Sequence, residues 1–134
     1  MKTHYLTFVA LIITAVNSAL ADNANIDTLL QAYASHGAID ADAEQGQYLW
    51  QKIYQSNSEF AERSCASCHT ENLTAPGKHV KTNKLIEPMS PSVNPQRLTD
   101  QKKTEKWFRR NCKWTMGREC TAQEKADLLL YINK

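Results

Sequence analysis

A five-residue motif near the middle of the chain, Cys65-Ala66-Ser67-Cys68-His69, restricts what this sequence can fold into more than any other feature. Cys-x-x-Cys-His is the attachment signature of a c-type haem. The two-residue spacer lets one tight turn bring both sulfurs to the same porphyrin edge, where each thiol adds to a vinyl group. The motif therefore predicts a domain around one covalent haem c, with Cys65 and Cys68 as thioether anchors and His69 as the proximal iron ligand.

Two other chemistries use Cys-x-x-Cys, and the sequence favours neither. A structural zinc site needs two more ligands at a workable spacing. The remaining cysteines, Cys112 and Cys120, are eight residues apart and do not form a second Cys-x-x-Cys knuckle. A thioredoxin-like redox centre requires a βαβ context, and the chain shows no such pattern.

The N-terminus has the anatomy of a secretory signal peptide. Met1-Lys2-Thr3-His4 is a short basic start, Tyr5 to Val16 is almost wholly apolar, and Ala19-Leu20-Ala21 is a small-x-small cleavage site. The apolar run is too short to span a bilayer stably, so an uncleaved membrane anchor is the less favoured alternative. Cleavage after Ala21 would export the protein to the periplasm, a compartment that also permits disulfides.

Removal of residues 1–21 would leave residues 22–134, which we predict to be a single monohaem cytochrome c domain. The formal net charge is +2, and loss of Lys2 with the signal peptide leaves 15 basic against 14 acidic residues, or +1. Such a weak field argues against a nucleic-acid partner. A haem would also give this short chain a large apolar body around which to build its core.

The mature chain is predicted to form helices joined by irregular loops. Apolar residues within 26–36 fall on one helical stripe that Gly37 ends, and Asp40 can cap a second helix that reaches about Gln55. We expect a third helix from Thr99 or Asp100 to about Arg110.

The last helix should begin at Thr121-Ala122-Gln123-Glu124, which is a capping box. The haem motif is expected in a loop. Thr70 to Pro95 contains all four prolines without a clear period, which predicts an extended loop around the cofactor. No convincing pair of alternating strands appears, so the predicted fold class is all-α.

This order of elements resembles the class I cytochrome c fold, in which a helix before the haem motif crosses the last helix. That contact typically uses a Gly and an aromatic residue on the first helix and an aromatic residue on the last. Gly46-Gln47-Tyr48-Leu49-Trp50 and Leu128-Leu129-Leu130-Tyr131-Ile132 look like the two halves. Gly46 would let the two backbones approach closely, although taken alone it also suits a surface helix.

Spacing alone does not identify the ligand on the other face of the iron. Met89 and Met116 are candidates, because many electron-transfer cytochromes use Met there, and His36 and His79 are also candidates. Each Met suits a core or surface position equally well, and each His suits a solvated one.

Cys112 and Cys120 are expected to pair, because two leftover cysteines in an exported protein usually form a disulfide. Gly117 can supply the backbone freedom that so small a ring needs. The ring is either a staple between the last two helices or a device that fixes Asn111, the preceding residue, at a helix end facing the haem. The residues alone leave both interpretations open.

A denser set of residues resembles the sphaeroides haem protein family of high-spin cytochromes c, over roughly Asp42 to Lys134. The segments that carry this resemblance are Glu105-Lys106-Trp107-Phe108-Arg109-Arg110-Asn111-Cys112, Gly117-Arg118-Glu119-Cys120-Thr121, Ile86-Glu87-Pro88-Met89 and Val93-Asn94-Pro95. In that family the residue before the first disulfide cysteine is the distal iron ligand, Asn in the sphaeroides haem proteins and His in the related cytochrome c″. The resemblance thus implies Asn111 as the distal ligand.

The resemblance also implies a function. An amide oxygen is a hard donor that suits ferric better than ferrous iron, so Asn111 would be lost on reduction and the ferrous haem could bind O2, NO or CO. An exported dihaem cytochrome c is implied as electron donor, and a membrane-anchored redox partner is compatible with this role.

Two alternatives to an electron-transfer and haem-ligand-binding protein remain. A haem enzyme, such as a peroxidase or an oxygen-reducing terminal unit, would want a distal acid–base residue, and no His lies beside Cys112. A redox or gas sensor would need a signalling partner, and no such domain is present.

Overall fold

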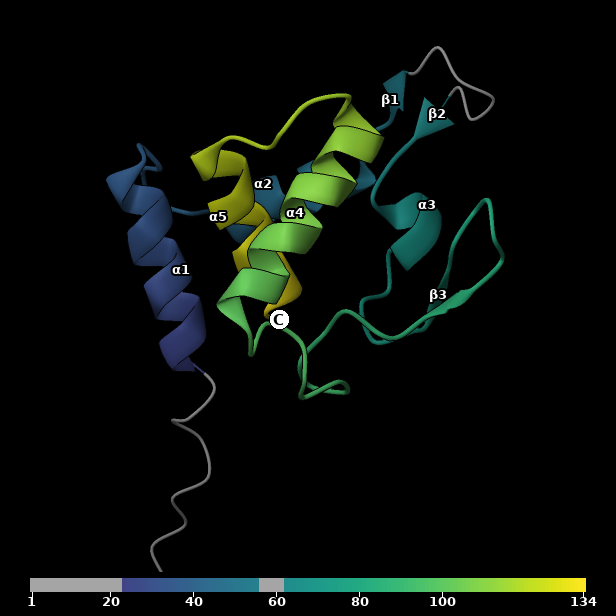
Figure 1. Ribbon diagram of the computed structural model, residues 1–134, viewed down its shortest axis with the longest axis horizontal. Helices are drawn as coiled ribbons and strands as arrows, with labels where there is room; N and C mark the ends of the chain where they lie inside the picture. The colour runs from purple at the N-terminus through teal and green to yellow at the C-terminus, as the bar shows by residue number, and fades with distance from the viewer. Residues whose placement is uncertain (1–22, 56–61) are drawn as a thin grey trace, which may run out of the picture.

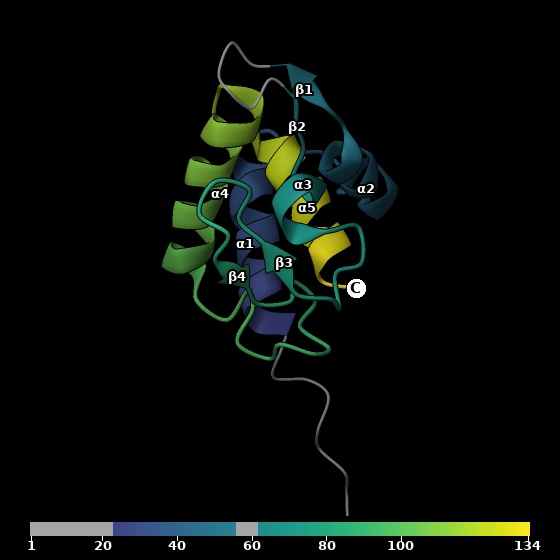
Figure 2. The same ribbon diagram turned by 90° about the vertical axis from the view of Figure 1, so that its right-hand side faces the viewer.

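A computed structural model describes residues 23–55 and 62–134 of the chain. The helices in this part are α1 (Asn23–Ser35), α2 (Ala43–Gln51), α3 (Ala66–His69), α4 (Gln101–Met116) and α5 (Ala122–Ile132). In Figures 1 and 2, α5 lies between α2 and α4, with α1 on one side and the segment containing α3 on the other. The all-α prediction is confirmed, and the predicted signal peptide lies outside the described residues.

Two very short antiparallel ladders join the helices. β1 (Tyr54–Gln55) pairs with β2 (Glu62–Arg63), and β3 (Gly77–Lys78) pairs with β4 (Leu85–Ile86). The sequence predicts no strand pair, because two-residue strands are too short to show an alternating pattern. The segment between Thr70 and Pro95 is otherwise irregular, as predicted. No helix among the described residues is long and apolar enough to cross a membrane.

The first helix buries the apolar side that the sequence predicts. Ile26, Leu29 and Tyr33 are buried in the core, and Gly37 follows the helix with a φ of +93° that favours glycine. The Tyr33 hydroxyl donates to the carboxylate of Glu105, which also accepts from Lys125 Nζ at 2.7 Å. This cluster ties α1 to both α4 and α5.

Both predicted ends of the second helix are wrong. Asp42 caps α2, since its carboxylate accepts from the Glu44 amide at 2.7 Å, whereas Asp40 precedes the cap in a left-handed conformation with φ +34°. The helix ends at Gln51, and the chain then leaves it so that Tyr54 and Gln55 pair with β2.

The close approach of α2 and α5 is confirmed at Gly46. A Cβ at this position would lie 2.1 Å from the carbonyl oxygen of Asp127 and 2.8 Å from the Cβ of Tyr131. Only glycine lets the two backbones pack this tightly. The aromatic contact is made by Trp50, whose ring lies 5.8 Å from that of Tyr131, whereas Tyr48 is 56% exposed.

The fourth helix starts where expected and ends later. Asp100 caps it through the Lys103 amide at 2.9 Å. The prediction that it ends near Arg110 is wrong, because the helix continues to Met116 and closes at Gly117 with φ +74°. Asn111 and Cys112 therefore lie inside α4. In α5, Thr121 and Glu124 form the predicted capping box.

We predict that Gly46→Ala destabilises the holoprotein by roughly 1–3 kcal/mol, because the added methyl group must push two helices apart. The free energy of unfolding from urea denaturation measures the change. Gln47→Ala, at the exposed neighbouring position, should shift it by less than about 0.5 kcal/mol. Equal stability of both variants would contradict the importance of this contact.

Candidate haem site

The Cys-x-x-Cys-His motif forms a helical turn, so its expected placement in a loop is wrong. The turn begins with a reciprocal pair of bonds: the Ser64 amide donates to Ser67 Oγ at 3.0 Å, and the Ser67 amide donates to Ser64 Oγ at 3.1 Å. This arrangement is a capping box with Ser in place of Glu. Cys65 and Cys68, three residues apart, therefore lie on one side of the turn, and both are free thiols.

The environment of Cys65 suits an uncharged sulfur. Burial raises the pKa of this thiol to about 12, so it stays protonated at neutral pH. Cys68 is only 8% exposed. A thioether carries no charge, so neither position would have to accommodate a buried anion after haem attachment.

The imidazole of His69 is held by its neighbours in a neutral form. Its ring centroid lies 5.5 Å from that of Trp50, and Trp50 Nε1 donates to the Thr70 carbonyl at 2.8 Å. Burial, with smaller electrostatic contributions from Arg97 and His79, lowers the pKa of His69 to about 4. A neutral imidazole is the form that binds a metal.

One ring nitrogen of His69 is left unsatisfied. Its Nδ1 atom is buried and has no hydrogen-bond partner in the part of the chain that the structure describes, which is unusual for a buried polar atom. Behind the motif, β3 packs so closely that a Cβ on Gly77 would lie 2.1 Å from the Cys68 carbonyl oxygen. Two same-sided thiols and an unsatisfied neutral imidazole, backed by a tightly packed strand, fit the anchors and axial ligand of a c-type haem.

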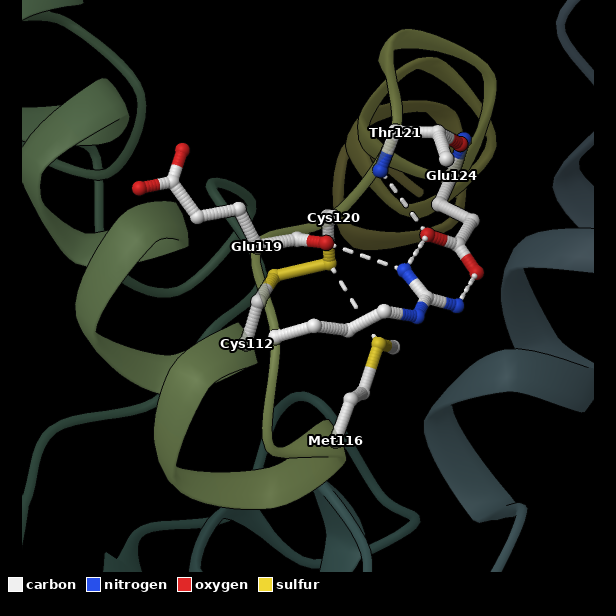
Figure 3. A network of polar contacts seen from close by, with 7 residues as sticks. Cys112, Met116, Glu119, Cys120, Thr121 and Glu124 are labelled. Atoms are coloured by element: carbon white, nitrogen blue, oxygen red, sulfur yellow. Dashed lines mark hydrogen bonds and ion pairs between the residues drawn. A yellow bond between two sulfur atoms is a disulfide. The ribbon is translucent and has the colours of Figure 1, made fainter.

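The second cysteine pair lies at the C-terminal end of α4. Cys112 and Cys120 form a disulfide with a Cα–Cα distance of 5.5 Å, and both residues are buried. Figure 3 shows the ring they close beside α5, where the Arg118 guanidinium forms two 2.7 Å bonds to the Glu124 carboxylate. The ring is thereby clamped to the first turn of α5.

Asn111 precedes this disulfide and is partly buried. Within the described chain, its side-chain amide makes no hydrogen bond, so it remains available to a ligand. Met116 packs on the disulfide, because its sulfur lies 3.6 Å from Cys120 Sγ. This contact differs from the iron ligation for which the sequence made Met116 a candidate. Met89 packs against the core.

The two candidate histidines have local roles. His36 is exposed at the end of α1, with Nδ1 2.7 Å from the Ala32 carbonyl oxygen, and α1 lies on the far side of α5 from the motif (Figure 1). His79 Nδ1 accepts from the amides of Lys81 and Thr82 at 3.2 Å each, so this nitrogen stabilises the turn between β3 and β4.

Three residues join the site without any signal in the sequence. Trp50 was expected only at the helix crossing, yet it also contacts His69. Arg97 donates to the Pro88 and Glu87 carbonyls at 2.8 and 2.7 Å and acts electrostatically on His69. The buried Tyr54 hydroxyl has no hydrogen-bond partner among residues 23–55 and 62–134, and burial raises its pKa to about 12. No motif marks Arg97 or Tyr54, and the pattern that contains Trp50 predicts only its helix contact, since tertiary packing alone brings these residues to the haem site.

Comparison with known proteins identifies the family. Residues 36–132 match a family described as a domain of unknown function, DUF1924. The chain is 39% identical over 124 residues to the cytochrome c-type protein SHP of Cereibacter sphaeroides, covering 91% of this chain and 95% of that protein. The chain belongs to the sphaeroides haem protein family. It is also 35% identical over 120 residues to cytochrome c″ of Methylophilus methylotrophus, covering 85% of this chain and 83% of that one.

Solved structures of this family share the fold. Oxidised SHP, described as an oxygen-binding cytochrome c, matches with a TM-score of 0.73 and 38% identity, over 81% of this chain and 95% of that one. Oxidised cytochrome c″ matches with a TM-score of 0.70 and 31% identity, over 81% and 92%. The class I-like cytochrome fold expected for the chain is thereby confirmed.

We predict that the double variant Cys112→Ala/Cys120→Ala loses about 2–3 kcal/mol of stability, because the open chain regains the entropy that the ring removes. Urea denaturation followed by circular dichroism measures the loss. Wild-type protein in reductant should unfold at the variant's midpoint. A variant that unfolds at the midpoint of the oxidised wild type would show that the disulfide contributes nothing to stability.

Proposed function

We propose that this protein is an exported monohaem c-type cytochrome that transfers electrons and binds a diatomic gas when reduced. The observation that carries the proposal is the pairing of two features in one family member. One is a helical turn with two same-sided cysteines that are not part of a disulfide, and the other is Asn111 directly before a disulfide on a separate helix. The description of SHP as an oxygen-binding cytochrome c supports the gas-binding part.

The proposed roles divide between the two sides of the haem. Cys65 and Cys68 hold the porphyrin as thioethers, and His69 supplies the proximal ligand from a ring that Trp50 orients. A haem bound in this way supplies an iron that carries one electron and has a sixth position for a ligand.

Asn111 is the proposed distal ligand of the oxidised state. Its amide oxygen is a hard, neutral donor, which prefers ferric to ferrous iron, so reduction favours its release. No other hydrogen bond within the described residues competes for this side chain. The solved cytochrome c″ structure described in terms of haem-ligand detachment, 32% identical with a TM-score of 0.70 over 83% of this chain and 94% of that chain, supports ligand release as a family property.

The proposal includes export and a protein electron donor. Residues 1–21 act as the signal peptide, residues 22–134 form the mature domain in the periplasm, and a disulfide such as Cys112–Cys120 is typical of an oxidising compartment. The family resemblance supports a dihaem cytochrome c as the donor, and a membrane-anchored redox protein would serve the same role. None of these features requires the protein to act as an enzyme.

We predict that Asn111→Ala changes the ferric absorption and EPR spectra to those of a five-coordinate or water-ligated haem, because the amide ligand is missing. The ferrous spectrum should stay the same, and stability should fall by less than about 1 kcal/mol. Gln47→Ala removes an exposed amide elsewhere and should leave both spectra unchanged. An unaltered ferric spectrum in Asn111→Ala would show that another residue is the distal ligand.

We also predict that the intact mass of the exported protein equals residues 22–134 plus one haem, less two hydrogens for the disulfide. Acidic organic solvent should extract no haem from it, because two thioethers hold the group. The variant Cys65→Ser/Cys68→Ser should release any haem that it binds. A retained N-terminus, or extractable haem in the wild type, would contradict the proposal.

A further inference from the structure

The charge of this protein is concentrated on one helix. α4 carries six of the 16 basic residues and one of the 14 acidic residues of the chain, a formal charge of +5. The rest of the chain holds ten basic and 13 acidic residues, or −3. A nearly neutral protein is therefore strongly polarised, with its positive end on α4.

These cations share an uncovered surface. The core side of α4 is formed by Thr104, Phe108, Cys112 and Thr115, and the helix lies at the edge of the molecule in Figure 2. The exposed residues of the opposite side define what we call the α4 face: Lys102, Lys103, Lys106, Trp107, Arg109, Arg110 and Lys113.

Few acidic groups of the protein neutralise the α4 face. Lys113 forms an ion pair with Glu119 at 3.0 Å, where both side chains are more than half exposed. Glu105, the one acid of the helix, is already bound by Lys125 and Tyr33. Within residues 23–55 and 62–134, no ion pair involves any of the other five cations.

The placement of these charges works against the stability of the helix. Lys102, Lys106 and Arg110 follow one another at four-residue intervals, and like charges at this spacing repel. The first turn contains lysines, and the acid at this positive end of the helix dipole is the Asp100 cap. Helix stability therefore does not explain the four-residue spacing of the cations, whereas binding to an external anion does.

Trp107 lies at the margin of the α4 face, one turn before Asn111 on the same side of the helix. The Arg110 guanidinium lies 5.1 Å from its ring centroid. Trp and Arg are the residues most enriched at the energetic centres of protein interfaces. Beside them, a shallow hollow between α4 and α5 is lined by Lys102, Glu105, Lys106, Arg109, Glu119 and Lys125. Four of these six residues are basic, so the hollow has a net positive charge that attracts a partner's carboxylate.

We propose that the α4 face is the docking surface for the electron donor, and that the donor presents an acidic protein surface to it. This inference rests on the proposed redox function, because the same helix carries Asn111. A 16-residue helix face fits the small interfaces of transient redox complexes, and charge complementarity would steer their encounter. A membrane fits less well, because surface helices insert their apolar side, and that side of α4 is buried.

The test uses the holoprotein on a gold electrode coated with a carboxylate-terminated monolayer, which imitates an acidic partner. Lys102→Glu/Lys106→Glu/Arg109→Glu should slow interfacial electron transfer roughly tenfold or more at low salt, and high salt should reduce the difference. Lys78→Glu/Lys81→Glu/Lys84→Glu makes the same charge change at exposed positions of β3 and of the turn that follows it and should have a much smaller effect. Equal losses in both variants would overturn the proposal.

Two further measurements separate the alternatives. Sedimentation with vesicles of equal parts phosphatidylglycerol and phosphatidylcholine should leave the wild type in solution, and binding that the α4 variant abolishes would assign the face to a membrane instead. Thermal unfolding of Lys102→Gln/Lys106→Gln should occur at a temperature no lower than in the wild type, since this variant removes repulsion without adding acids beside Glu105. A lower temperature would give the cations a structural role and overturn the argument.

Absorption spectra keep this proposal distinct from the proposed function. The α4 variant should show the wild-type ferric and ferrous spectra, because none of its substitutions touches Cys65, Cys68, His69 or Asn111. Slow electron transfer with unchanged spectra supports docking at the α4 face. If the wild-type spectra show no change of iron ligand on reduction, the proposed function is contradicted. The electrode measurement would still test docking at the α4 face separately.

Discussion

The backbone contact between α2 and α5 at Gly46 is the constraint on which the haem site depends. Because Gly46 has no side chain, α2 lies directly against the carbonyl of Asp127, and one turn later Trp50 enters the core beside Tyr131. The same tryptophan contacts the His69 ring and binds the carbonyl that follows it. A side chain at position 46 would therefore disturb the imidazole through a chain of direct contacts, although the two residues are far apart in sequence.

Features that depend on short stretches of sequence were predictable. The haem motif, the capping box at Thr121 and the glycine contact at Gly46 each follow from local chemistry or from a spacing that physical geometry requires. Helix ends were less predictable. α2 ends early because Tyr54 pairs with β2. α4 ends at Met116 because Gly117, in a left-handed conformation, terminates it. In both cases a residue outside the helix decides where the helix ends. The contacts of Arg97 and Tyr54 had no sequence signal, because they arise only when distant segments pack together.

α4 combines three properties that the sequence showed only as separate patterns. Its core side carries Phe108 and one half of the disulfide, its C-terminal part carries Asn111, and its outer side carries the cations of the α4 face. The extension of the helix beyond Arg110 is what joins them, since it places Asn111 in continuous helix with the positive surface. A protein bound to the outer side and a ligand bound near Asn111 would thus be connected by one rigid element.

The disulfide between Cys112 in α4 and Cys120 also limits the motion of the end of this helix. Helix ends usually open locally at little cost in free energy, but Cys112 is bonded to Cys120 across the end of this helix, and Arg118 holds the connecting turn on α5. The last turn can therefore fray only if α5 moves with it. A side chain that is not tightly packed changes rotamer within picoseconds to nanoseconds. The Asn111 side chain can therefore rotate while the backbone of α4 stays in place. The Asn111 side chain would thus move away from a ligand without any unfolding of α4. Amide hydrogen exchange near Asn111 would therefore be equally slow in the oxidised and reduced protein.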